Sequence, residues 1–93
     1  MAGVPTIRAV SDLQVAVKLF ASVREAVGRE EVTVRLSPGA AVRDLLERLA
    51  AEYPEIARHG RSLAVAVNHE IAPGSRVLLP GDEVALIPPV GGG

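Results

Sequence analysis

One segment of this 93-residue chain has the spacing of an amphipathic helix, and segments of alternating polarity lie on both sides of it. Apolar residues recur there at i, i+3, i+4, i+7, i+8 and i+11, which places them on one face of a helix. They are Val42, Leu45, Leu46, Leu49, Ala50 and Tyr53. Pro54 disfavours helical geometry at the residue before it, so this helix is predicted to end at Tyr53. A helix of this kind between strand-like segments can bury its apolar face by lying across a sheet.

Five segments are predicted to be strands. Residues 13–20 and 31–36 alternate apolar and polar side chains, as strands with one buried face do. The connection between them is too short for a parallel crossover, which predicts an antiparallel pair. Further strands are predicted at residues 63–67, 70–71 and 83–87. The sequence therefore predicts an α+β fold in which one main helix lies across a mixed sheet.

A short helix is predicted between the first two strands. Ser22 and Glu25 have the spacing of a capping box at its start, and Gly28 stands where a glycine often ends a helix. On the surface of the main helix, Asp44 and Arg48 are predicted to form an ion pair at the i,i+4 spacing.

The chain is predicted to contain one domain, because its length suits a single core. Residues 1–12 are assigned to an N-terminal extension, in which residues 6–10 could form a short strand. Residues 13–87 are assigned to the domain, and residues 88–93 to an extended tail.

Composition and charge argue against several classes of function. The net charge is −1 and the aromatic residues are Phe20 and Tyr53, so neither a basic face nor a stacking platform for nucleic acid is expected. The chain has no cysteine, which excludes disulfides, thiolate metal sites and a cysteine nucleophile. No apolar stretch approaches the about 20 residues of a membrane span, and the first ten residues do not resemble a signal peptide. We expect a cytoplasmic protein that binds neither membrane nor nucleic acid.

The polar residues do not form a recognisable catalytic or metal-binding motif. His59 is interpreted as a solvated loop residue and His69 as part of a turn, too few and too far apart for a metal site. Asp82 and Glu83 are interpreted as a turn that leads into a strand. No glycine-rich phosphate-binding loop is present. We expect a protein with no bound metal or cofactor and no catalytic activity of its own.

The last six residues are the unusual feature. Pro88 and Pro89 restrict φ and favour an extended exit from the sheet. Gly91, Gly92 and Gly93 have no side chains, so the backbone of another protein can close tightly around them. The terminal carboxylate becomes an acyl donor once it is activated, for instance by adenylation with ATP. The alternative interpretation is a flexible tail without function.

From residue 15 onward the chain resembles the MoaD-like small subunits of molybdopterin synthase, which are ubiquitin-like sulfur carriers. Within the ending, Gly81-Asp82 and the terminal diglycine are shared by sulfur carriers generally, whereas Pro88-Pro89-Val90 indicates the molybdopterin branch and not the thiamin branch. Gly91 departs from the usual Ser or Thr, and the N-terminal extension exceeds the typical start. The resemblance lies in residues 17–28, 41–46, 66–68 and 81–93.

The resemblance implies a β-grasp, or ubiquitin-like, fold and a cycle of sulfur transfer. An adenylating enzyme related to ubiquitin-activating enzymes would use ATP to activate the carboxylate of Gly93. A sulfur donor enzyme would convert it to a thiocarboxylate. The tail would then enter the large subunit of molybdopterin synthase, which transfers the sulfur to cyclic pyranopterin monophosphate. The implied assembly is a heterotetramer in which this chain is the non-catalytic subunit.

Such a carrier needs an apolar docking surface near its tail. The candidates are Phe20, Ile87 and Val90, with Leu86 packed inward. The alternative is that Phe20 and Ile87 belong to the core.

Three other functions remain open from the sequence. The chain could carry sulfur for thiamin, for a thiolated tRNA base or for cysteine synthesis. It could also be a ubiquitin-like modifier that forms isopeptide bonds through Gly93. Finally, it could be a β-grasp interaction module whose tail is inert.

Overall fold

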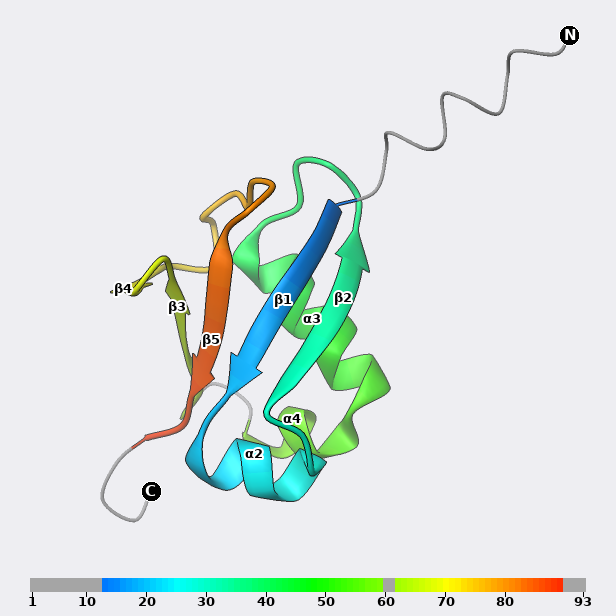
Figure 1. Ribbon diagram of the computed structural model, residues 1–93, viewed down its shortest axis with the longest axis vertical. Coiled ribbons are helices and arrows are strands. Elements are labelled where there is room, and N and C mark those ends of the chain that lie inside the picture. The colour runs from blue at the N-terminus through cyan, green and yellow to red at the C-terminus, as the bar shows by residue number, and fades with distance from the viewer. Residues whose placement is uncertain (1–12, 60–61, 90–93) are drawn as a thin grey trace, which may run out of the picture.

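The computed structural model describes residues 13–59 and 62–89 (Figure 1). The predicted strand at residues 6–10 lies outside this part of the chain. The elements in chain order are β1 (Leu13–Leu19), α2 (Ala21–Val27), β2 (Glu31–Leu36), α3 (Val42–Glu52), α4 (Pro54–His59), β3 (Ala64–Val67), β4 (Glu70–Ile71) and β5 (Glu83–Ile87).

The strands form one mixed sheet in the order β2-β1-β5-β3-β4. β1 pairs with β2 in antiparallel and with β5 in parallel orientation, and β3 is antiparallel to both β4 and β5. In Figure 1, α3 lies across one face of the sheet, while α2 and α4 lie at the end where β1 and β5 finish. The predicted β-grasp fold, with one main helix on a mixed sheet, is confirmed.

The core lies between α3 and the inner face of the sheet. Alternate residues of β1 are buried, and Val17 is paired in register with Val32 of β2 and Val84 of β5. Leu45 and Leu49 of α3 cover them and are completely buried. Burial of each aliphatic side chain stabilises the fold by about 1.5–3 kcal/mol. The buried side chains therefore determine which face of each strand points toward α3 and which points outward.

The predicted capping box at Ser22 and Glu25 is wrong. α2 begins at Ala21, its N-cap is Phe20, and no side chain caps it. The predicted end is confirmed, because Gly28 has a left-handed φ of 83° and its N–H donates to the carbonyl of Arg24 at 2.8 Å. The chain therefore turns from β1 directly into the helix. With Ser22 as the N-cap, the helix would have begun at residue 23.

The predicted ion pair between Asp44 and Arg48 is also wrong. Asp44 instead accepts a hydrogen bond from the N–H of Ala41 at 2.8 Å, at the start of α3. Arg48 pairs with Glu52, with 3.5 Å between Nε and the carboxylate. The carboxylate of Asp44 thus stabilises the N-terminus of the helix, where the backbone N–H groups lack partners.

Helix α4 has no counterpart among the predicted elements. Pro54 ends α3 as predicted, but it also occupies the first position of α4, a place that suits proline. His59 is therefore not a solvated loop residue. It is half-buried, its Nδ1 lies 3.1 Å from the carbonyl oxygen of Glu55, and its Nε2 lies 3.2 Å from Oγ of Ser22.

Candidate docking face and tail root

The tail leaves the sheet beside α2 and α4. β5 ends at Ile87, Pro88 is buried and Pro89 is exposed. A hollow of about 510 Å³ surrounds this point and is lined by Ala21, Ser22, Arg58, His59, Ser62, Pro88 and Pro89. The buried Pro88 fixes the place and direction in which the tail starts. The other predicted tail residues, Val90, Gly91, Gly92 and Gly93, lie outside the described part of the chain.

The hydrogen bond between Ser22 and His59 joins the two helices at the tail root. It connects α2 to α4 at 3.2 Å, and the ring of His59 is held from its other side by the carbonyl of Glu55. The sequence contained no signal for this contact, because the two residues are 37 positions apart.

The outer face of the sheet, which points away from α3, carries a shallow apolar hollow near the tail root. The register places Ala85 of β5 between Lys18 of β1 and Ala66 of β3. The small alanine side chains leave a hollow of about 350 Å³. Apart from the completely buried Val84, the apolar lining of this hollow is called the docking patch here, and it consists of Phe20, Ala66, Ile71, Ala85 and Ile87.

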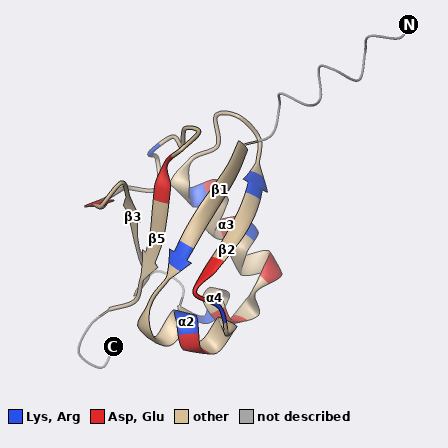
Figure 2. Cartoon of the chain, in the orientation of Figure 1, with Lys and Arg blue, Asp and Glu red and all other residues tan. Residues whose placement is uncertain are grey.

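Large apolar side chains of the docking patch are open to solvent. Phe20 is 43% exposed and Ile71 is 68% exposed, whereas Ile87 is half-buried. Lys18, His69 and Glu83 also line the hollow, so charged or polar residues flank the apolar centre, and Figure 2 shows the basic segment near the end of β1 and the acidic start of β5. An apolar centre with a polar rim is the usual anatomy of a protein–protein interface.

Phe20 owes its position to a strained backbone. The next residue, Ala21, has a left-handed φ of 52°, which costs a non-glycine residue about 1–2 kcal/mol. This conformation turns the chain sharply from β1 into α2. The alternative that Phe20 belongs to the core is wrong, and Leu86 is completely buried as predicted. A docking role for Phe20 and Ile87 stays a prediction, and Ile71 is a patch residue that the sequence analysis missed.

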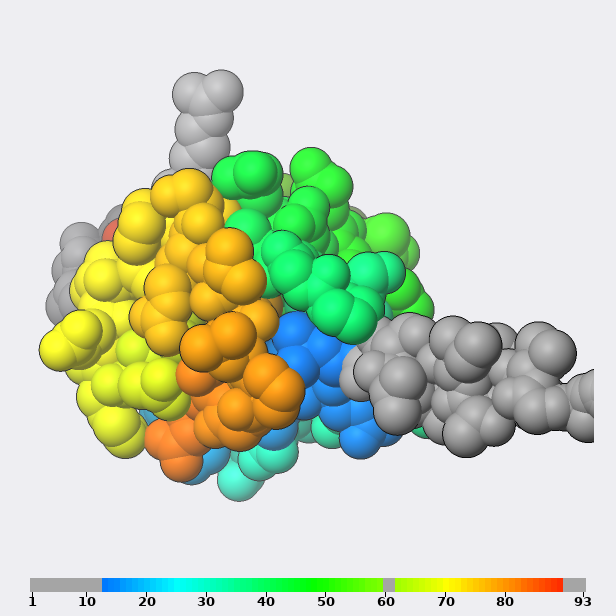
Figure 3. Space-filling model, turned by 90° about the horizontal axis from the view of Figure 1, so that it is seen from above, coloured from blue at the N-terminus to red at the C-terminus, as the bar shows by residue number. Residues whose placement is uncertain are grey.

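A polar network holds the start of β5 at the end of the molecule opposite the tail. Both carboxylate oxygens of Asp82 accept hydrogen bonds, one from Nδ2 of Asn68 at 2.9 Å and one from the N–H of Leu79 at 2.8 Å. Oδ1 of Asn68 accepts from the N–H of Glu83 at 3.0 Å, and Arg76 lies 3.7 Å from Asp82. Figure 3 shows this end, where the loop between β4 and β5 packs beside the turn after β2.

The same contacts shift the ionisation of Asp82. The hydrogen bond from the N–H of Leu79 holds the pKa of the Asp82 carboxyl below its ordinary value of 3.8. Burial acts in the opposite direction, while Asn68 and Arg76 lower the pKa further. The prediction that Asp82 is a turn residue is confirmed, and its long-range partner Asn68 was not predicted.

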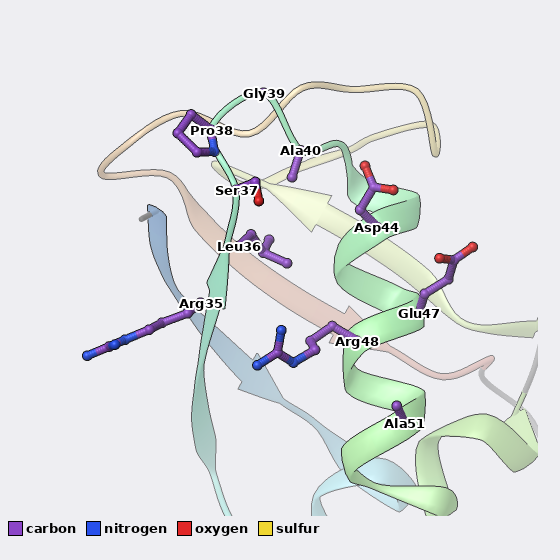
Figure 4. Close-up of a pocket in the computed structure, with 10 residues that line it drawn as sticks. All are labelled: Arg35, Leu36, Ser37, Pro38, Gly39, Ala40, Asp44, Glu47, Arg48 and Ala51. Carbon is purple, nitrogen blue, oxygen red and sulfur yellow. The ribbon is translucent and has the colours of Figure 1, made fainter. Parts of the chain in front are cut away.

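A larger hollow, of about 910 Å³, lies between β2 and α3. Figure 4 shows Arg48 pointing from α3 toward β2, whereas Arg35 points away from the hollow. The carboxylates of Asp44 and Glu47 point away from both arginines. Because these charged groups do not converge, the hollow offers no pair of groups for acid–base catalysis.

Two absences hold for residues 13–59 and 62–89. No group of three or more His, Asp or Glu side chains there is arranged to hold a metal ion. None of the helices there is long and apolar enough to cross a membrane.

Comparisons with known proteins agree with this geometry. Residues 17–93 match the model of the ThiS family. The molybdopterin synthase sulfur carrier subunit of Mycobacterium tuberculosis is 45% identical over 84 residues, which cover 87% of this chain and 99% of that protein.

Solved structures show the same fold. SAMP1 from Haloferax volcanii superposes with a TM-score of 0.76 at 33% identity, covering 86% of this chain and 99% of that one. A chain in the complex of subunits 1 and 2 of the molybdopterin-converting factor from Helicobacter pylori superposes with a TM-score of 0.64 at 22% identity, covering 87% and 100%. The second likeness shows the fold alone. Together, the family match and the M. tuberculosis relative show that this chain belongs to the ThiS family, among the sulfur carrier subunits of molybdopterin synthase.

Proposed function

We propose that the chain carries sulfur as a thiocarboxylate on Gly93 and delivers it to the large subunit of molybdopterin synthase. The observation that carries the proposal is the tail that ends in three glycines and leaves the sheet from a fixed root beside an exposed apolar patch. The 45% identity to a sulfur carrier subunit supports the same function.

The proposed cycle has three steps, and partner enzymes perform the chemistry of each. A cytoplasmic adenylating enzyme uses ATP to form a mixed anhydride between AMP and the carboxylate of Gly93. A sulfur donor enzyme then supplies the sulfur that displaces AMP and leaves the thiocarboxylate. Finally, the large subunit transfers this sulfur to cyclic pyranopterin monophosphate, and two transfers complete its dithiolene.

The contribution of this chain is to present its terminus. The buried Pro88 sets the starting direction of the tail, and the glycines let the walls of a narrow active site approach the backbone. The docking patch lies beside this root, so a partner bound there is placed to receive the tail. We propose that the adenylating enzyme and the large subunit use the patch in turn. A complex of the two subunits is known for the H. pylori protein that shares this fold.

The first test is the intact mass of the chain after incubation with ATP, a cognate adenylating enzyme and a sulfide source. Exchange of one carboxylate oxygen for sulfur gives a characteristic mass gain. We expect this gain in the full chain and none in a chain that lacks Gly93. Addition of the large subunit and the pyranopterin substrate is then expected to remove it again.

The absence of a mass gain would contradict the proposal, provided that the same enzyme preparation charges another sulfur carrier. A gain that persists without Gly93 would place the chemistry elsewhere in the chain.

A second candidate function is protein modification. It is favoured by the 33% identity to SAMP1, a small archaeal modifier protein. In this function an amine of another protein, instead of sulfur, attacks the activated Gly93. Conjugates of higher mass on a denaturing gel, absent when Gly93 is deleted, would distinguish it from sulfur transfer.

A further inference from the structure

The chain contains very few side chains that can capture an activated acyl group. Lys and Arg together number ten, and Lys18 is the single lysine among them. Cysteine is absent. Amines and thiols attack activated carboxyl groups, whereas the guanidinium group of arginine stays protonated in proteins. The surface is therefore positively charged at many places but offers one nucleophilic amine side chain.

That amine lies at the docking patch. Lys18 is exposed on the outer face of β1, and it lines the hollow together with Phe20 and Ile87. Its partner in register is Ala85, two residues before the end of β5, so it stands close to the root of the tail. Within the described part of the chain, Lys18 takes part in no ion pair.

We propose that Lys18 is an acyl-acceptor site, at which the activated Gly93 of a second copy of this chain forms an isopeptide bond. The inference rests on the proposed function, because adenylation of Gly93 supplies the acyl donor. The neutral amine of Lys18 attacks the carbonyl carbon of Gly93. The new C–N bond replaces the C–O bond to AMP, AMP leaves, and the amine releases one proton to water.

The surroundings of Lys18 suit this acceptor role. The donor tail carries Pro88, Pro89 and Val90 just before its glycines, and an apolar segment of this kind matches the apolar walls of the hollow. A tail that lies there brings its terminal carbonyl to the amine, and such proximity raises the rate of the reaction. The linked copy would cover the docking patch, so the acceptor would lose access to its partners.

The test uses acceptors and donors that cannot exchange roles. The donor is the full chain with Lys18→Arg, and its Gly93 is prepared as a thioester, so that no adenylating enzyme is needed. Every acceptor lacks Gly92 and Gly93 and has an acetylated N-terminus. The three acceptors carry Lys18, Lys18→Arg, or Lys18→Arg with Arg43→Lys, which moves the amine to an exposed position on α3.

We expect the Lys18 acceptor to form the linked product about tenfold faster than the Arg43→Lys acceptor, which corresponds to about 1.4 kcal/mol of positioning. The Lys18→Arg acceptor should form none. Intact mass and fragment mapping identify the bond. Equal rates for the amines at positions 18 and 43, or no product with Lys18, would overturn the inference. Because the thioester is preformed, a failure of enzymatic adenylation would appear only in the sulfur-transfer test.

Discussion

Asp82 uses both of its carboxylate oxygens, and this makes it sensitive to a change of a single atom. One oxygen accepts from Asn68 and the other from the N–H of Leu79. An asparagine at this position keeps one oxygen and replaces the other with an NH2 group, which donates hydrogen bonds and cannot accept one. One of the two donors must then lose its partner.

Asp82→Asn is therefore expected to lower the free energy of unfolding by about 1.5–3 kcal/mol, the range for a lost hydrogen bond to a charged group. Urea denaturation measures this change. The matched control is Glu83→Gln, because the carboxylate of Glu83 is exposed and, among the described residues, pairs with the likewise exposed His69 at 3.1 Å. The control should change stability by less than about 0.5 kcal/mol. Equal effects of the two substitutions would contradict the role given to Asp82.

The lowered pKa of Asp82 predicts the direction of a pH effect. Its folded-state pKa lies below the ordinary value of 3.8, so the unfolded chain takes up this proton first as the pH falls. The stabilisation is complete well above that value and is lost as the pH falls through the folded pKa. The difference in stability between the wild type and Asp82→Asn should therefore shrink below about pH 5. A difference that stays constant down to about pH 3 would contradict the assignment.

At the scale of the elements, the five strands, the main helix and the short helix α2 were predicted, whereas helix α4 was not. β2 and β5 match their predicted ranges, and α3 ends one residue early. Helix α4 has six residues and begins at Pro54, a residue that the sequence predicts only as the end of the preceding helix. Its stability comes from the burial of Ile56 against the core and from contacts with α2, which local sequence does not encode.

The docking patch was predictable only in part for the same reason. Phe20 and Ile87 are close to the strand ends and were predicted as docking residues. Ile71 belongs to a strand of two residues, and its place in the patch depends on the pairing of Ala66 with Ile71 across β3 and β4. A pairing between strands is a long-range property, so no pattern within the 70–71 segment indicates it.

Phe20→Ala is expected to weaken binding to the adenylating enzyme or to the large synthase subunit by about tenfold or more, as loss of a central aromatic contact does. Its effect on folding should be small, because the side chain is already 43% exposed. The control is Leu79→Ala, an apolar residue that is 57% exposed in the loop at the opposite end of the molecule. Calorimetric titration measures the affinity of each variant for the partner. Equal loss of affinity in the two variants would argue against the docking patch.

At the scale of the whole molecule, the proposed chemistry and the fold are separate. Among the described residues, the buried apolar cluster extends no further along the chain than Leu86, and β5 ends at Ile87, six positions before Gly93. Removal of Gly92 and Gly93 is therefore expected to change the free energy of unfolding by less than about 0.5 kcal/mol while it abolishes sulfur loading. Urea denaturation and intact mass measure the two effects. A large loss of stability would show that the tail contributes to the fold.

The parallel pairing of β1 with β5 also decides how the domain responds to mechanical force. β1 starts at one end of the molecule, and β5 finishes at the other (Figure 1). A pull on the tail, opposed at the beginning of β1, slides the two strands along each other and loads all hydrogen bonds between them at once. Those bonds must then break together, unlike the bonds of a hairpin, which open one after another. A pull on the tail that is opposed at the start of β1 therefore loads the domain in shear between β1 and β5.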